Sequence, residues 1–159
     1  MNNMDLIENL RSQSTWKLLG LGIITYGVYF AYYIQTQSRE INAAINSDDN
    51  ISSALINSIL VMSYASLALF IAYLFVEEGH PIEGVSGLVD MIVGIMLIVW
   101  GFKARNRVNS CCNLSTESDI WFHGLWTFLF TPMYFNYKVN CILESNVEQA
   151  GVRLKTNIK

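Results

Sequence analysis

The stretch from Ala54 to Val76 reads ALINSILVMSYASLALFIAYLFV and contains no charged residue. A helix rises about 1.5 Å per residue, so this stretch would reach roughly 34 Å, enough to cross a hydrocarbon core of about 30 Å. A buried helix of a soluble domain rarely exceeds about 20 residues and normally shows a polar stripe. Here that stripe amounts to Asn57, Tyr64 and a few serines. The stretch therefore predicts a transmembrane helix.

The composition agrees with a membrane protein. The 159 residues are 52% hydrophobic and 14% charged, whereas soluble domains carry about 25% charged residues. The net charge of −3, with ten scattered Lys and Arg, indicates no nucleic-acid partner. The three cysteines have no metal-binding spacing, and we expect no metal, other cofactor or catalytic residue. The bilayer itself is the first expected partner.

Three further apolar segments lie at 16–34, 85–102 and 120–137. The acidic turn 77–84 contains Gly79, Pro81 and Gly84, which end helices. The segments 54–76 and 85–102 should therefore form a transmembrane helical hairpin. We expect one all-α membrane domain over 1–159, with a membrane region at 16–137 and a polar loop after 102.

The two ends of the chain are expected to lie outside the hydrocarbon core. Residues 1–15 should form a surface tail with a short helix, because apolar and charged side chains fall on opposite sides. The apolar side has Leu6, Ile7 and Leu10, and the charged side has Asp5, Glu8 and Arg11. Residues 138–159 should form a cytosolic amphipathic tail.

The two outer segments are similar when the chain is shifted by about 105 positions. Trp16 then aligns with Trp121, and Tyr29-Phe30-x-Tyr32 with Tyr134-Phe135-x-Tyr137. The helix breakers Gly27 and Pro132 also coincide. Both an internal repeat and a chance match between aromatic-rich segments explain this similarity.

The distribution of positive charge leaves two topologies open. Lys and Arg near helix ends stay in the cytoplasm. Four full spans would divide the ten Lys and Arg between the two sides of the membrane. If the outer segments instead bend at Gly27 and Pro132 and return, only the turn 77–84 is outside, and all ten are cytoplasmic. A bend at membrane depth must pack against other helices, because lipid cannot satisfy its backbone groups.

The third apolar segment has a face of small residues. Gly87, Gly94 and Gly101 recur every seven residues, and Ala68 and Ala72 would supply a matching surface on the preceding helix. Small residues let two helix backbones approach closely, so these five predict a helix-packing face.

Asp90 shares the glycine face, so it should point at protein, level with about Ile71 and Ala72. An ionisable group inside a membrane segment is a candidate ion or proton site. A structural or interfacial role is the alternative, since Asp90 lies close to the start of its segment.

Two other residue types have simpler explanations. His123 has no nucleophile or carboxylate at a useful spacing, so we interpret it as an interfacial residue. Cys111 and Cys112 follow a basic cluster at 103–107, as in juxtamembrane acylation sites, but we interpret them as reduced, unmodified cysteines, with acylation as the alternative.

The stretch from Gly22 to Tyr33, followed by the polar helix Gln37-Ser38-Arg39-Glu40-Ile41-Asn42, resembles a family of small bacterial multi-pass membrane proteins of unknown function. Its members share a T-x-G-x-Y-x-x-Y/W core and a polar helix after it. The segment 134–140 is similar to the family's last segment. Ala31-Tyr32 departs from the tryptophan usual there. The resemblance implies a bacterial inner-membrane location and no catalytic residues.

These observations predict a non-enzymatic integral membrane protein that acts through helix packing. It would assemble with copies of itself or serve as an accessory subunit of another membrane protein. The alternative is a small oligomeric ion or proton channel or transporter that uses Asp90. A membrane enzyme is a third hypothesis, for which the sequence offers neither a metal-ligand cluster nor a nucleophile with a base.

Overall fold

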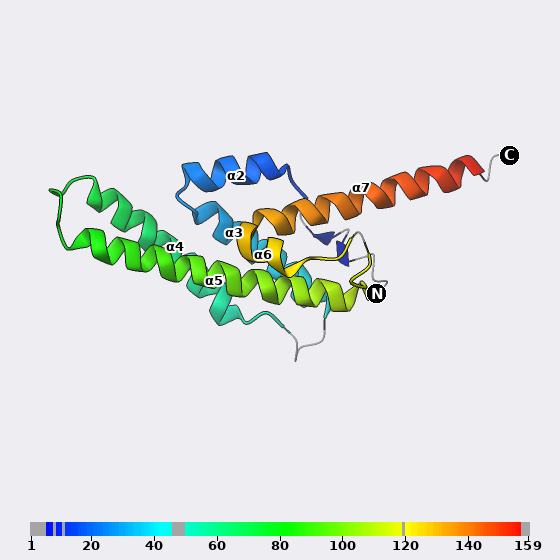
Figure 1. The fold of residues 1–159 in the computed structure, drawn as a ribbon, viewed down its shortest axis with the longest axis horizontal. Helices are drawn as coiled ribbons and strands as arrows, with labels where there is room; N and C mark the ends of the chain where they lie inside the picture. Colours follow the sequence, from blue (N-terminus) through cyan, green and yellow to red (C-terminus); the bar gives the residue numbers. More distant parts are fainter. Residues whose placement is uncertain (1–5, 8, 11, 46–49, 119, 157–159) are drawn as a thin grey trace.

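The structure is a computed structural model that describes residues 6–7, 9–10, 12–45, 50–118 and 120–156, with side chains up to 145. Within these ranges the chain forms helices and loops without strands, as the all-α prediction requires (Figure 1). The helices are α2 (Thr15–Ile24), α3 (Val28–Ala44), α4 (Ser53–Tyr73), α5 (Ile82–Cys111), α6 (Gly124–Phe130) and α7 (Met133–Thr156).

Helices α4 and α5 run side by side and are joined by the loop 74–81 (Figure 1). The buried residues of α4 are spaced three and four apart, which places them on one face of the helix: Ile56, Ile59, Ser63 and Ser66. The loop turns at Gly79, whose φ of 80° favours glycine, and α5 begins directly after Pro81. The start of α5 therefore lies three residues before the predicted start at 85.

Helix α5 continues nine residues beyond 102, where the sequence predicted a polar loop, and ends at Cys111. Trp100, Ala104 and Val108 are fully buried and four residues apart. Side chains four residues apart lie on one face of a helix, so these three residues form an apolar stripe that continues the helix beyond 102. The charged residues between them, Lys103, Arg105 and Arg107, favoured the prediction of a polar loop.

Two helix breaks lie at Gly27 and Pro132. Helix α2 ends at Ile24 and α3 begins at Val28, and Gly27 between them has a φ of 85°. Helix α6 ends at Phe130 and α7 begins at Met133. The starts of α3 and α7 are 105 positions apart. Both second helices run on into polar sequence, α3 to Ala44 and α7 past Gly151 to Thr156.

The core lies where α3, α5 and α7 meet, and Trp100, Tyr33 and Phe122 are its largest fully buried side chains. The N-terminal segment also reaches this core, because Leu6, Ile7 and Leu10 are each at most 2% exposed. The sequence predicted a surface tail there. Three apolar side chains on one side of a short helix gain more free energy by packing into the core than by lying on the surface. The charged side, with Asp5, Glu8 and Arg11, lies outside the described residues.

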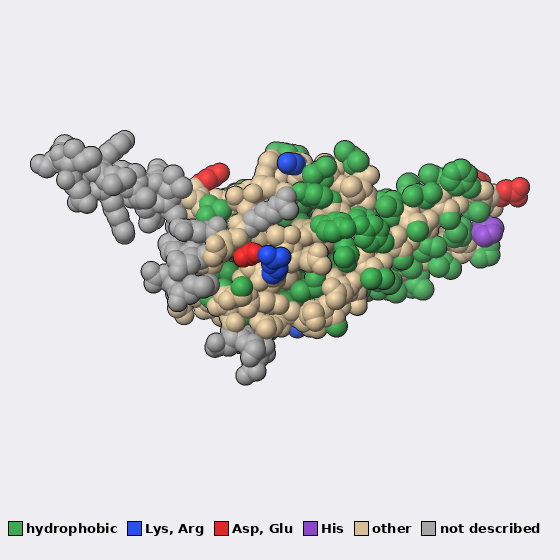
Figure 2. Space-filling view, turned by 180° about the vertical axis from the view of Figure 1, so that it is seen from behind, with side chains coloured by type: hydrophobic (Ala, Val, Ile, Leu, Met, Phe, Trp, Pro, Cys, Tyr) green, Lys and Arg blue, Asp and Glu red, His purple; other side chains and the backbone are tan. Residues whose placement is uncertain are grey.

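The far part of the hairpin, residues 61–99, is called the hairpin arm below, and the packed remainder the body. Only 22% of the most apolar part of α4 and 17% of that of α5 are buried. Hydrophobic side chains cover the hairpin arm, with acidic residues and a histidine at its tip (Figure 2). Exposed examples are Val61, Ile71, Val85, Leu88, Met91 and Ile95. Both helices are long and apolar enough to cross a membrane.

Candidate functional site

Asp90 accepts hydrogen bonds from two side chains on other elements. The Tyr26 hydroxyl, from the break between α2 and α3, donates to Oδ2 at 2.9 Å. The Ser66 hydroxyl, from α4, donates to Oδ1. The Tyr26 ring also stacks on Phe70, with 4.4 Å between the ring centroids. Asp90 therefore ties the break between α2 and α3 to both helices of the hairpin.

The local sequence of the break directs Tyr26 toward the hairpin. The Thr25 hydroxyl donates to the Leu21 carbonyl at 2.7 Å and accepts the Tyr29 amide at 2.9 Å. This one side chain satisfies backbone groups at the end of α2 and the start of α3. Tyr26 itself has a φ of 49°, and Gly27 follows with a φ of 85°. The two positive φ values reverse the chain and place the Tyr26 hydroxyl beside Asp90.

An open groove of about 430 Å³ lies beside this cluster. Its walls come from α2, α3, α5 and the start of α7, and are almost entirely apolar, with Asp90 as the carboxylate. The lining residues on α2, α3 and α5 include Leu19, Ile23, Phe30, Val93, Gly94 and Leu97. No ion pair to Asp90 is found among the described residues, so both of its close partners are neutral.

Asp90 contacts protein, as the sequence suggested, but at a different level of α4. The prediction placed it beside Ile71 and Ala72, whereas its hydrogen bond goes to Ser66. Five residues of helix separate Ser66 from Ile71, which is roughly 7.5 Å. The shift arises because the turn between the two helices lies three residues earlier than predicted, at 74–81 instead of 77–84.

The small residues of the hairpin have different surroundings. Gly101 is buried, and a Cβ there would lie 2.6 Å from the Thr131 side chain, so α6 approaches α5 at this glycine. A Cβ at Gly87 or Gly94 would meet no atom within 4 Å. Ala68 is exposed and Ala72 is half-buried. The buried small residues of the hairpin include three serines instead: Ser63, Ser66 and Ser86.

Sequence reasoning missed Tyr26 and Ser66 as partners of Asp90. Tyr26 is one of several aromatic residues in the segment 16–34, and only its place next to Gly27 distinguishes it. Ser66 is one of several serines on α4, and nothing in its neighbours distinguishes it. Both contacts join positions that are far apart in the sequence, so periodicity alone could not identify them.

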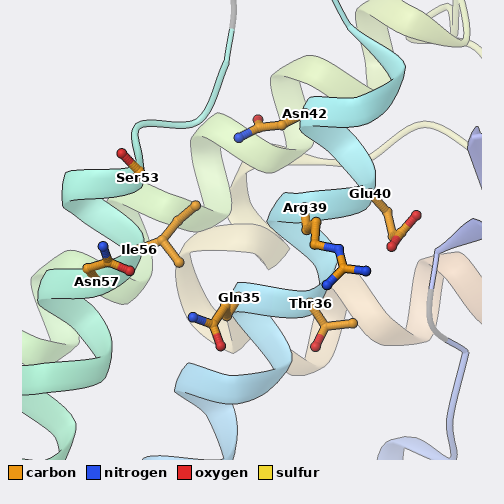
Figure 3. Close-up of a pocket in the computed structure, with 8 residues that line it drawn as sticks. All are labelled: Gln35, Thr36, Arg39, Glu40, Asn42, Ser53, Ile56 and Asn57. Carbon is orange, nitrogen blue, oxygen red and sulfur yellow. The ribbon is translucent and has the colours of Figure 1, made fainter.

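A second cavity lies between α3 and the start of α4, and Figure 3 shows its lining. It measures about 610 Å³, and most of the residues that line it are of polar types, with Gln35, Arg39, Glu40, Asn42 and Asn57 among them. Arg39 and Glu40 form no ion pair within the described part of the chain. Asn42 is occupied, since its amide exchanges two hydrogen bonds with the backbone of Ile51, at 2.7 and 2.9 Å.

The remaining candidate residues offer no cluster for chemistry. The searched part of the chain, which excludes the undescribed residues, holds no group of three His, Cys, Asp or Glu side chains able to bind a metal. His123 is exposed, and its backbone amide donates to the Tyr134 hydroxyl at 3.0 Å. The cysteines form no disulfide. Burial, with the neighbouring Cys111, raises the pKa of the Cys112 thiol to about 11.

Comparison with known proteins gives one result. Neither the curated proteins nor the solved structures contain a significant match to this chain. A family model described as "Domain of unknown function (DUF4234)" matches residues 13–110, which is more than half of the chain and contains α2 to α4 and all but the last residue of α5. The chain therefore belongs to the DUF4234 family.

Proposed function

We propose that this protein is an integral membrane protein whose α4 and α5 cross the bilayer as a hairpin. One observation carries the proposal: both helices are apolar enough to span, yet only 22% and 17% of their most apolar parts are buried. The core helix of a soluble protein would be mostly buried, and an exposed apolar surface this large is costly in water. Lipid is the solvent in which the hairpin arm has no such cost.

The outer segments enter the membrane and return in this proposal. Helix α2 has 10 residues and α6 has 7, so they measure roughly 15 and 10 Å and cannot cross about 30 Å of hydrocarbon. The Tyr29 hydroxyl, just after the first break, donates to the Gln13 side chain before α2, at 2.9 Å. This contact fits a chain that folds back. The loop 74–81 is then outside, and all ten Lys and Arg are cytoplasmic.

Within this topology the protein acts without catalysis, by packing its hairpin against another helix. The space over Gly87 is open, and exposed apolar side chains at Leu88 and Met91 stand next to it. A glycine on a membrane-facing surface lets a second helix approach closely. The partner is a second copy of this chain or a helix of another membrane protein.

Disulfide crosslinking in membranes tests this proposal. In a variant without native cysteines, Leu88→Cys should crosslink to a partner chain, because it stands beside Gly87. Val61→Cys, which is also exposed but on α4, is the matched control. Monomer alone for both variants, with no co-purifying membrane protein, would contradict the packing role. Labelling of a cysteine at position 78 from inside the cell would contradict the topology.

The alternative function is a small ion or proton conduit. It is favoured by Asp90, an ionisable side chain on the hairpin arm that has neutral partners only. Reconstituted liposomes should then show a proton or cation flux that Asp90→Asn abolishes. Flux that is equal in both proteins, or absent from the wild type, would remove this alternative.

A further inference from the structure

We propose that the groove beside Asp90 binds a lipophilic organic cation, a molecule with a positive charge inside an apolar shell. The inference rests on the proposed placement of the hairpin arm in lipid, and it assigns a ligand class to a cavity at that depth. A groove of about 430 Å³ lies within the size range of small-molecule sites. Its walls and its one carboxylate determine which molecules fit.

The walls select an apolar body. Leu19 and Ile23 of α2, Phe30 of α3, and Val93 and Leu97 of α5 line the groove. A small inorganic cation would lose its water there and find too few oxygen atoms to replace it. A ligand whose own surface is apolar has no such loss. The rings of Tyr26 and Phe30 in the same lining add faces that attract a cation.

The carboxylate selects a positive charge. Tyr26 and Ser66 each donate one hydrogen bond to Asp90, while an ionised carboxylate has about four acceptor positions. The described part of the chain supplies no ion pair to it. At membrane depth an ionised carboxylate without a counter-charge is costly, so a bound cation stabilises it. The two neutral donors orient the carboxyl group and bring no positive charge to it.

The groove is accessible at a position that tolerates substitution. Gly94 lies one helical turn from Asp90, on the same face of α5, and lines the groove. A Cβ at Gly94 would meet no atom within 4 Å, so there is space for a side chain to begin at this position of the groove lining. Gly87 has the same open space but does not line the groove, which makes it a matched control.

Two probes of the same shape and opposite charge test the inference. Purified full-length protein in detergent micelles is dialysed against tetraphenylphosphonium or tetraphenylborate, with protein-free micelles as the blank. The wild type should bind the phosphonium saturably and the borate weakly. Asp90→Asn should weaken phosphonium binding by at least about tenfold, because it removes one partner of a desolvated charge pair. Glu83→Gln, an exposed carboxylate on the same helix, should leave the binding unchanged.

The glycine variants separate the groove from the charge. Gly94→Val should weaken phosphonium binding by at least about tenfold, because its methyl groups fill the groove next to Asp90. Gly87→Val should bind like the wild type. The proposal is overturned by equal binding of both probes, by no saturable binding in the wild type, or by variants of Asp90 and Gly94 that bind normally. An equal loss in Gly87→Val and Gly94→Val also overturns it.

Membrane extraction keeps this inference apart from the proposed function. Each variant is expressed in membranes and washed with alkaline carbonate, which removes proteins that do not span. If Asp90→Asn and Gly94→Val resist the wash and still bind the phosphonium normally, only the cation site is contradicted. A wild-type protein that the wash removes contradicts the membrane placement, and the cation site with it.

Discussion

The hairpin arm and the body use the same helices but bury different amounts of them. Helix α5 is half-buried or exposed over most of its first 18 residues, and from Trp100 onward its residues Trp100, Gly101, Ala104, Val108 and Asn109 are buried. In the arm, many apolar side chains therefore face outward. In the body, the apolar side chains are enclosed by other helices. One continuous helix thus passes from a region suited to lipid to a region that is packed like a soluble domain.

The polar contacts of the two regions differ in the same way. In the body, buried polar side chains bind each other or the backbone, as the Trp100 indole N–H does when it donates to the Ser38 hydroxyl at 2.8 Å. In the arm, the side-chain hydrogen bonds to other helices among the described residues are those of Asp90 with its two donors and the one that the Tyr64 hydroxyl shares with the Tyr32 hydroxyl. The difference indicates that specific side-chain contacts hold the body together, whereas the arm has few of them.

The largest effect should come from charges placed on the outer face of the arm. Met91→Lys with Ile95→Lys introduces two lysines at exposed positions. Each should cost about 2.5 to 3.5 kcal/mol at the centre of a membrane helix, so the pair costs about 5 to 7 kcal/mol. We expect the double variant to be removed from membranes by alkaline carbonate.

The control for this pair lies on the same helix with the same spacing. Asn106→Lys with Ser110→Lys changes two exposed residues of the body. This variant should stay in the membrane like the wild type. If the arm is in water instead, the lysines at 91 and 95 should improve solubility and leave the fold intact, which would break the comparison between arm and body.

A smaller effect should follow from a cavity in the body. Trp100→Ala removes a fully buried side chain that packs against Phe135, with 5.4 Å between the ring centroids. The loss should reduce the free energy of unfolding by about 3 to 5 kcal/mol. Val99→Ala, one residue earlier but 41% exposed, should change it by less than about 1 kcal/mol. Thermal unfolding in detergent, followed by circular dichroism, measures both, and equal shifts would contradict a packed body.

The arm was predictable from the sequence, because an uncharged stretch of this length and a Gly and Pro turn have few alternatives. Gly27 and Pro132 also stood out in the sequence as helix breakers, because glycine and proline have special backbone requirements. The comparisons support an uncharacterised family, and the structure supports two helices able to span. These features are local in the sequence, and each depends on one or two residue types.

The body was harder to predict because its contacts join distant segments. Three charged residues between 103 and 107 suggested a loop, while Trp100, Ala104 and Val108 continued the helix. The buried position of Leu6, Ile7 and Leu10 depends on a core that forms from α3, α5 and α7. The partners of Asp90 depend on how far α4 and α5 are shifted along each other, which a few extra helical residues decide.

A third prediction concerns the polar contacts that hold the body together. The Asn109 side chain exchanges two hydrogen bonds with the backbone of Phe122, at 3.2 and 3.3 Å, and so fixes the loop after α5. Asn109→Ala leaves the Phe122 amide unpaired, whereas the Phe122 carbonyl keeps its hydrogen bond from the Arg105 side chain, and the loss should cost about 1 to 3 kcal/mol. The exposed neighbour Ser110→Ala should cost little. Hydrogen exchange should quicken at the Phe122 amide in the first variant only, and equal exchange in both would show that the loop is held otherwise.

The smallest effect concerns the Cys112 thiol, which lies at the end of α5 in the body. Burial raises its pKa to about 11, from an ordinary value of 9. At pH 8 its thiolate is roughly 100-fold scarcer than that of an ordinary cysteine, and its greater nucleophilicity restores about a factor of 6 to 10. A protein with Cys112 as its one cysteine should therefore react with iodoacetamide about ten to fifteen times more slowly than a model peptide.

The pH profile of this reaction decides the cause of the slow rate. Because the folded protein holds the pKa near 11, the rate should still rise between pH 9.5 and 10.5, where a thiol with a pKa near 9 has levelled off. A rate that levels off near pH 9 would place Cys112 in water. That result would make it accessible to acylation and would move the end of α5 out of the packed body.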